Sequence, residues 1–258
     1  MRVELTVLGS GTSLGVPTIG CRCAVCRSTD PKDNRTRPSV LLRYNQRAVL
    51  IDTTPDFRFQ ALRADMDRLD AILYTHSHAD HILGLDDIRP FTLQENKVIP
   101  IYGNRQAIEG IRRVFKYIFD GNYPFGGVPL IQDHIINGPL ELFGLRFVPV
   151  MVLHGYLEVL GFRFGPVAYL TDLKRIPDAS LPLLRGLDTL FLDALRHEDH
   201  PAHMTVAEAL EQVERIKPRR TFFTHIAHDL GHQATNARLP RHVRLAYDGL
   251  QLEFEAGG

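Results

Sequence analysis

Residues 75–81 read Thr-His-Ser-His-Ala-Asp-His and follow an apolar run, residues 71–74, that is typical of a β-strand. Histidine accounts for 12 of the 258 residues, so three histidines and an aspartate within six consecutive positions are a rare arrangement. In extended or tight-turn geometry, His76 and His78 can ligate one cation, while Asp80 and His81 ligate a second after the chain turns. A solvated polar turn is the alternative, and the spacing favours the metal site.

The bulk composition is that of an ordinary globular chain. A length of 258 residues is enough for one large domain, 44% of the residues are apolar and 23% are charged. Thirty basic residues balance thirty acidic ones, so no global field attracts nucleic acid or an anionic membrane. A small substrate is therefore a more natural partner than a polyanion.

The first residues contain no apolar signal core, and no apolar run approaches the length of a bilayer crossing. The three cysteines are too few and too closely spaced for a disulfide framework. These features predict a soluble, cytoplasmic protein with no membrane partner.

The hydrophobic pattern predicts strands interleaved with fewer helices. Helical periodicity covers residues 57–64, 106–119 and 205–216. Apolar and β-branched runs predict strands at residues 3–8, 39–44, 48–51, 71–74, 98–102, 145–150, 161–164, 167–170, 189–192, 220–224 and 250–254. The pattern indicates an α/β chain.

Polar residues with ligand chemistry come just after several predicted strands. Asp52, His76, Asp172 and His225 each follow an apolar run by one or two positions. Strands that end in such residues predict that one rim of a sheet forms the active face, assembled from distant parts of the sequence.

Residues 120–129 are rich in glycine, proline and aromatic residues and follow a predicted helix. The region 104–130 is therefore a candidate lid or dimer contact, which leaves a homodimer open, and a plain surface excursion is the alternative.

Asp52, the His-x-His-x-Asp-His motif, His154, Asp172 and His225 follow one another in an order that resembles the metallo-β-lactamase-fold hydrolases. The resemblance covers most of the chain. It implies a single domain, residues 1–258, with a four-layer αββα sandwich of two mixed sheets and helices on the outer faces. It also implies one metal on His76, His78 and His154, a second on Asp80, His81 and His225, and a bridging Asp172.

Two divalent cations, Mn²⁺ or Zn²⁺, suit this set of imidazoles and carboxylates and can share a hydroxide that attacks phosphorus. Asp52 is expected to orient a liganding histidine by a hydrogen bond, with a structural turn as the alternative. Taken singly, His154 can also be a core histidine and Asp172 a helix cap.

The cysteines, Cys21, Cys23 and Cys26, are spaced as in zinc loops and need one more ligand for a tetrahedral site. His228, three residues after His225, is the best candidate. We therefore expect a structural zinc in an N-terminal loop around residues 15–30, with three free thiols as the alternative.

The cysteines, together with the glycine-rich residues 9–17 before them, resemble the phosphoribosyl cyclic phosphate phosphodiesterase (PhnP-like) group. No Gly-Lys-Ser/Thr follows the glycines, so tight turns rather than a phosphate loop are expected. The resemblance implies a catalytic histidine that matches His203, and we expect Asp80 to act in catalysis as well. His197 and His200 compete with His203, and Asp193 is a candidate partner for it.

The leading hypothesis is a dinuclear metal-dependent phosphodiesterase acting on a small phosphodiester, with cyclic phosphodiesters among the candidates. One alternative is an endonuclease resembling the tRNA 3′-processing enzymes, although neither a basic run nor an RNA-gripping arm is visible. A second is an accessory or binding protein resembling the coenzyme PQQ production proteins. The sequence carries no export signal, which disfavours β-lactam hydrolysis.

Overall fold

The computed structural model describes residues 1–93, 96–120 and 127–257. Its strands form two seven-stranded sheets within these residues. The first sheet has the order β14 (Gln251–Glu255), β1 (Arg2–Gly9), β2 (Ser39–Tyr44), β3 (Arg47–Ile51), β4 (Ala71–Leu73), β5 (Ile99–Gly103) and β6 (Ile131–Ile135). The second has the order β13 (Val243–Leu245), β12 (Arg220–Thr224), β11 (Thr189–Asp193), β10 (Val167–Leu170), β9 (Leu157–Phe164), β8 (Leu145–His154) and β7 (Leu140–Leu142).

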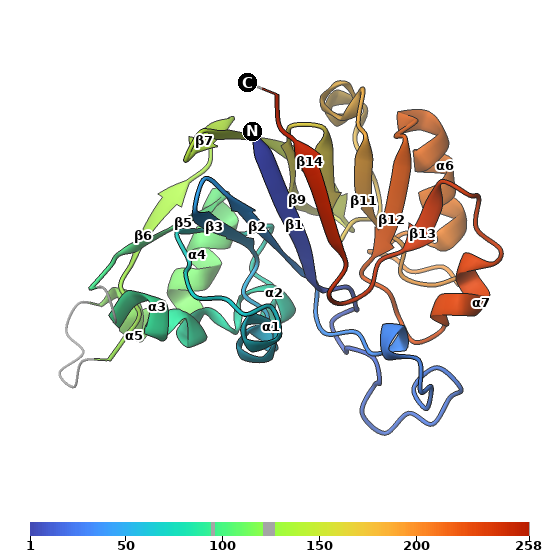
Figure 1. The fold of residues 1–258 in the computed structure, drawn as a ribbon, viewed down its shortest axis with the longest axis horizontal. Coiled ribbons are helices and arrows are strands. Elements are labelled where there is room, and N and C mark those ends of the chain that lie inside the picture. Colours follow the sequence, from blue (N-terminus) through green and yellow to red (C-terminus); the bar gives the residue numbers. More distant parts are fainter. Residues whose placement is uncertain (94–95, 121–126, 258) are drawn as a thin grey trace.

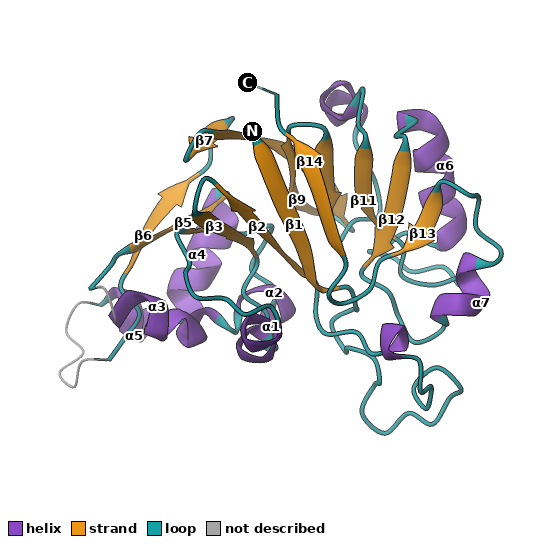
Figure 2. Cartoon of the chain, viewed as in Figure 1, coloured by secondary structure: helices purple, strands orange, loops and turns teal. Residues whose placement is uncertain are grey.

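Helices cover the outer face of each sheet, which makes four layers (Figures 1 and 2). The first sheet is covered by α1 (Phe57–Arg63), α2 (Ala79–Ile82), η2 (Leu85–Ile88), α3 (Arg89–Leu93), α4 (Arg105–Val114) and α5 (Lys116–Phe119). The second is covered by η3 (Asp178–Leu184), α6 (Val206–Ile216) and α7 (His232–Asn236), while η1 (Pro31–Asp33) lies in the N-terminal loop. The predicted αββα fold class is confirmed. None of the helices in the described part has the length and apolar character that a bilayer crossing requires.

Each central strand contributes to two hydrophobic cores. Val40 and Leu42 of β2 pack between the two sheets, whereas Leu41 packs under the helices of the first outer layer. In β3, Val49 packs between the two sheets and Leu50 packs under the same helices. Because both faces of these strands are buried, their sequences are continuous apolar runs rather than alternating ones.

The strand carboxyl ends converge on one edge of the sandwich. Strands β3 and β4 are parallel neighbours, as are β10, β11 and β12. Parallel neighbours end at the same edge of a sheet, so the residues that follow them lie close together. The rim predicted from the sequence is therefore present.

The strands and the long helix predicted from the sequence differ from the structure in two respects. Strands β6, β7 and β13 are additional, and each is an outermost strand of its sheet. The predicted helix at residues 106–119 is broken into α4 and α5 at Phe115, whose φ of −105° and ψ of 37° are not helical while its ring is buried under the first sheet. In the candidate lid region, α4 packs against β5 and β6, and residues 121–126 lie outside the described residues.

Gly84 holds α2 close to the loop that follows β3. Its N–H donates to the Thr53 carbonyl at 3.0 Å, and a Cβ at this position would lie 2.1 Å from the Thr54 carbonyl oxygen. We therefore expect Gly84→Ala to lower the free energy of unfolding by about 1–3 kcal/mol. Chemical denaturation measures the change, with Gly138→Ala as the matched control because no atom lies within 4 Å of its added Cβ. Equal stability of the two variants would contradict this account of α2.

Candidate metal centre

Unusual backbone turns place several of the candidate ligands. Asp52 follows β3 with a φ of 65°, Asp172 follows β10 with a φ of 55°, and His225 follows β12 with a φ of 58°. Residues other than glycine adopt the left-handed region at a cost of about 1–3 kcal/mol, and such strain concentrates at functional sites. The three strained residues lie on the same rim.

His76, His78 and His154 form the first cluster, with one donor atom from each within 4.8 Å of the others. The Nδ1 atom of His154 lies 2.9 Å from the Ala202 carbonyl, and Nδ1 of His76 lies 3.0 Å from the Thr75 hydroxyl. These contacts occupy Nδ1 in both rings. The Nε2 atom of His76 is buried without a hydrogen-bond partner, as a nitrogen that faces a cation would be.

Asp80, His81, Asp172 and His225 form the second cluster. The Asp172 carboxylate lies 3.1 Å from Nε2 of His81 and 3.1 Å from Nε2 of His225, and Asp80 lies 3.4 Å from Nε2 of His81. Ligand atoms bound 2.0–2.2 Å from a shared cation are about 3.0–3.5 Å apart, so the spacing fits one ion. Asp172 also lies within 4.8 Å of His154 and His203, which suits a bridge between the two clusters.

Asp52 lies behind His81 of the second cluster. Its Oδ2 atom lies 2.8 Å from Nδ1 of His81 and accepts a hydrogen bond from the Thr75 hydroxyl, and its Oδ1 atom accepts the Thr75 N–H. Burial raises the pKa of Asp52, although His81 and Thr75 oppose that shift. This carboxylate directs Nε2 of His81 toward Asp80 and Asp172. Thr75 was not among the predicted site residues, although its position directly before the histidine motif is a signal for such a role.

The two clusters differ in charge. Burial lowers the pKa of His76 and of His154, so both rings are neutral and ready to coordinate. Burial acts in the same direction on the second cluster, but Asp172 and Asp80 outweigh it and raise the pKa of His225 to about 10 and that of His81 well above its usual value. In turn, the two histidines overcome the effect of burial and depress the pKa of Asp172.

His203 borders both clusters. Its ring centroid is 4.5 Å from those of His154 and His225, and its Nδ1 atom lies 2.8 Å from the Asp193 carboxylate. Asp193 is fully buried and also accepts the N–H of Leu173. Of the two competing histidines, His200 lies with its ring 5.0 Å from that of His203, whereas His197 is exposed and lines a groove against α6 and α7.

Cys21, Cys23, Cys26 and His228 form a separate cluster with donor atoms within 4.8 Å of one another. Nδ1 of His228 lies 3.3 Å from the sulfurs of Cys21 and Cys23, close to the edge of about 3.5 Å expected around tetrahedral zinc. The N–H groups of Thr18 and Cys26 point at sulfurs of the cluster. A hydrogen bond from the Cys26 N–H, with His228, lowers the pKa of Cys23 to about 6, whereas burial raises that of Cys26 to about 11.

Comparison with known proteins identifies the family of this chain. Residues 47–226 match the model of the beta-lactamase superfamily domain. A structure described as a new diphosphatase from the PhnP family is 54% identical, with a TM-score of 0.94 over 99% of this chain and 98% of that one. The chain belongs to the PhnP family of the beta-lactamase superfamily.

Two further relatives are more distant or longer. Zinc-bound PqqB from Methylobacterium extorquens shares the fold, with a TM-score of 0.74 at 21% identity over 96% of this chain and 99% of that one. An octanoyltransferase from Porphyromonas gingivalis is 38% identical over 98% of this chain but only 52% of its own length. The chain thus spans about half of the curated relatives that it matches.

The charge asymmetry predicts proton release when divalent cations bind. A ligating histidine must be neutral, so the raised pKa values mean that His81 and His225 each lose a proton at pH 7, whereas His76 and His154 have none to lose. We expect about two protons from these histidines per loaded centre, in addition to those that the cysteine thiols release when their own site is filled, and a weaker apparent affinity as the pH falls. Calorimetric titration of metal-free protein in buffers of different ionisation enthalpy measures this number. A value near zero would contradict the assignment.

Proposed function

We propose that this chain is a metal-dependent hydrolase whose centre holds two divalent cations and cleaves a small phosphodiester. His76, His78 and His154 would hold one cation; Asp80, His81 and His225 would hold the other; and Asp172 would bridge them. Such cations, when bound, activate water and stabilise the charge that develops on phosphoryl oxygens. The donor set suits Zn²⁺ and Mn²⁺ alike.

The observation that carries this proposal is the burial of a dense group of donors that the protein itself leaves unsatisfied. Nε2 of His76 and Nδ1 of His225 are buried without hydrogen-bond partners among the described residues, while Nε2 of His81 and Nε2 of His225 each lie 3.1 Å from the Asp172 carboxylate. Buried polar atoms normally have partners, so a cluster without them favours a resident cation. Asp80 places a second carboxylate near Asp172, and the two negative charges repel each other. A cation bound between them would offset this repulsion.

His203 would exchange a proton with the substrate. Because the Asp193 carboxylate also accepts the Leu173 N–H, Nδ1 of His203 is the donor in the pair, and Nε2 remains for the leaving oxygen or a phosphoryl oxygen. Asp80 would serve as a ligand at the reacting centre. Cys21, Cys23, Cys26 and His228 would hold one structural zinc outside the reaction.

A small substrate suits the space beside the first cluster. A cavity of about 80 Å³ lies there, lined by His76, His78, Asn104, Gln106 and Glu158 among others. The balanced charge of the chain offers no attraction for a long polyanion. These observations favour a small phosphodiester over transfer RNA.

A diphosphate is the second candidate substrate, because the 54% identical relative is described as a diphosphatase. A diphosphate and a phosphodiester are both cleaved at phosphorus, so the same ligands serve either reaction. The octanoyltransferase relative does not support acyl transfer by this chain, because this chain matches only 52% of the length of that protein.

Removing the His203 imidazole should slow the chemical step. We expect His203→Ala to lower kcat by about 10²–10⁴-fold on bis(p-nitrophenyl) phosphate with both cations still bound. His197→Ala is the matched control, because this exposed histidine belongs to the same loop and points elsewhere. The assay reports kcat together with the metal content of each variant. Equal loss in both variants, or none in His203→Ala, would reject the role.

Comparing substrates separates the two candidates. The metal-loaded protein is assayed on a cyclic phosphodiester and on a diphosphate ester with the same organic group, and kcat/KM is compared. We expect the cyclic diester to be the better substrate, because the cysteine and glycine-rich motifs of this chain resemble those of the cyclic phosphate phosphodiesterases. A higher kcat/KM for the diphosphate would replace the phosphodiesterase proposal. Salt-sensitive tRNA binding would favour the endonuclease.

A further inference from the structure

The cysteine loop has no hydrophobic core. None of residues 17–32 is buried, although Val16 before them and Asp33 after them are. A segment of this kind cannot offset its conformational entropy by apolar burial, so its order depends on the metal and on whatever fixes the remaining ligand. That ligand, His228, lies far away in the sequence.

Arg35 is a buried charged residue that contacts the backbone on either side of His228. Its side chain has no exposed area, and its guanidinium donates to the Ala227 carbonyl at 3.1 Å and to the Leu230 carbonyl at 2.7 Å. These two carbonyls flank His228. A planar guanidinium with donors in a fixed fork is suited to hold two carbonyl groups at a set separation.

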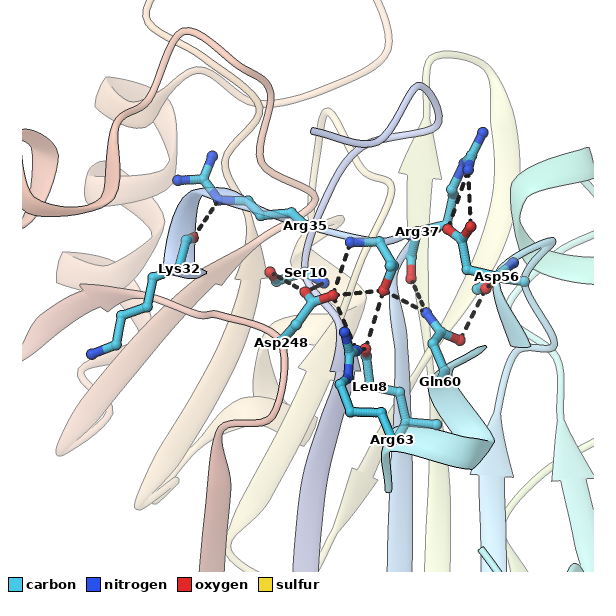
Figure 3. Close-up of polar contacts among 11 residues, drawn as sticks. Leu8, Ser10, Lys32, Arg35, Arg37, Asp56, Gln60, Arg63 and Asp248 are labelled. Carbon is cyan, nitrogen blue, oxygen red and sulfur yellow. Dashed lines mark hydrogen bonds and ion pairs between the residues drawn. The ribbon is translucent and has the colours of Figure 1, made fainter. Parts of the chain in front are cut away.

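The same guanidinium is braced from the other side. Nη2 of Arg35 lies 3.0 Å from the Asp33 carboxylate, which also accepts the N–H of His232 at the start of α7. Nε donates to the Lys32 carbonyl (Figure 3). Arg35 and Asp33 therefore hold residues 227–232 by three hydrogen bonds, which involve the backbone of Ala227, Leu230 and His232.

Arg35 also sets where the cysteine loop leaves the body of the protein. Its backbone N–H and carbonyl pair with Val16 at 2.7 and 2.9 Å, directly before the loop begins. The ends of the surrounding segment are anchored by Asp248, which accepts hydrogen bonds from Ser10 and Thr36 and pairs with Arg63 (Figure 3). One residue thus joins the base of the cysteine loop to the backbone around His228.

We propose that Arg35 is a positioning residue for the thiolate zinc site, which holds His228 in its liganding position before the metal binds. The inference rests on the zinc site proposed above. With His228 fixed in advance, the ion has to order only the loop that carries the cysteines. Pre-arranged ligands of this kind raise metal affinity because less entropy is lost on binding.

Cobalt titration of the metal-free full chain tests this proposal. Co²⁺ at thiolates gives a sulfur-to-metal charge-transfer band that imidazole and carboxylate ligands do not give, so the band reports this site apart from the catalytic centre and without any assay of activity. We expect Arg35→Lys, which keeps the charge and loses the fork, to weaken cobalt binding at the thiolates by about 10–100-fold. Asp33→Asn should weaken it in the same direction and serves if Arg35→Lys does not fold.

Arg163→Lys is the matched control. Arg163 likewise donates to backbone carbonyls, those of Gly165, Leu183 and Arg185, but lies in β9 of the second sheet. The control should keep the cobalt affinity of the parent chain. Thermal unfolding of each variant with and without metal separates positioning from general stability, because the stabilisation by a ligand grows with the logarithm of its affinity.

Each outcome decides the question. If Arg35→Lys lowers the melting temperature equally with and without metal and keeps the parent affinity, Arg35 is only a structural residue and the proposal fails. If the parent chain itself shows no charge-transfer band, the zinc site is absent and the inference falls with it. A reduced affinity in Arg35→Lys with an unchanged Arg163→Lys supports the proposal.

Discussion

The carboxylate of Asp172 is the group whose burial the rest of the site must compensate. Asp172 is 2% exposed, follows the end of β10 and lies between the two clusters of candidate ligands. An ionised carboxylate in such a place is stable only when opposite charge and hydrogen bonds surround it. His81 and His225 supply that charge in the described structure, because Nε2 of each lies 3.1 Å from the carboxylate. In the proposed metal-bound state, the cations would supply it instead.

The rim of the sandwich could be predicted because its signals are local. Asp52, His76, Asp172 and His225 each follow an apolar run, and parallel strands bring such positions together. The strands that escaped prediction, β6, β7 and β13, are all outermost in their sheets. The fourth outermost strand, β14, was predicted, but β6, β7 and β13 each have polar residues among few apolar ones and so lack the apolar run by which the central strands are recognised.

Other features depend on contacts that no local pattern encodes. The left-handed backbone at Asp52, Asp172 and His225 occurs where propensity disfavours it, and only the packed sheets around these residues hold it. The Ala202 carbonyl that fixes His154 comes from a loop 48 residues away. The proximity of His228 to the cysteines could be predicted because three thiolates need a fourth ligand for a tetrahedral zinc site. Arg35 gave no sequence signal, because a single arginine is normally a surface residue.

One short segment connects the two candidate metal sites. His225 belongs to the catalytic cluster and His228 to the thiolate cluster, and Ile226 between them exchanges hydrogen bonds with Ser10 and Thr12. The glycine between those two partners is needed for this contact, since a Cβ on Gly11 would lie 2.8 Å from the Arg35 carbonyl oxygen. The glycine-rich run therefore serves close backbone packing, as the missing lysine of a phosphate loop indicated. Because residues 225–228 are consecutive and Ile226 is fixed by the glycine-rich run, the same backbone contacts position both His225 and His228.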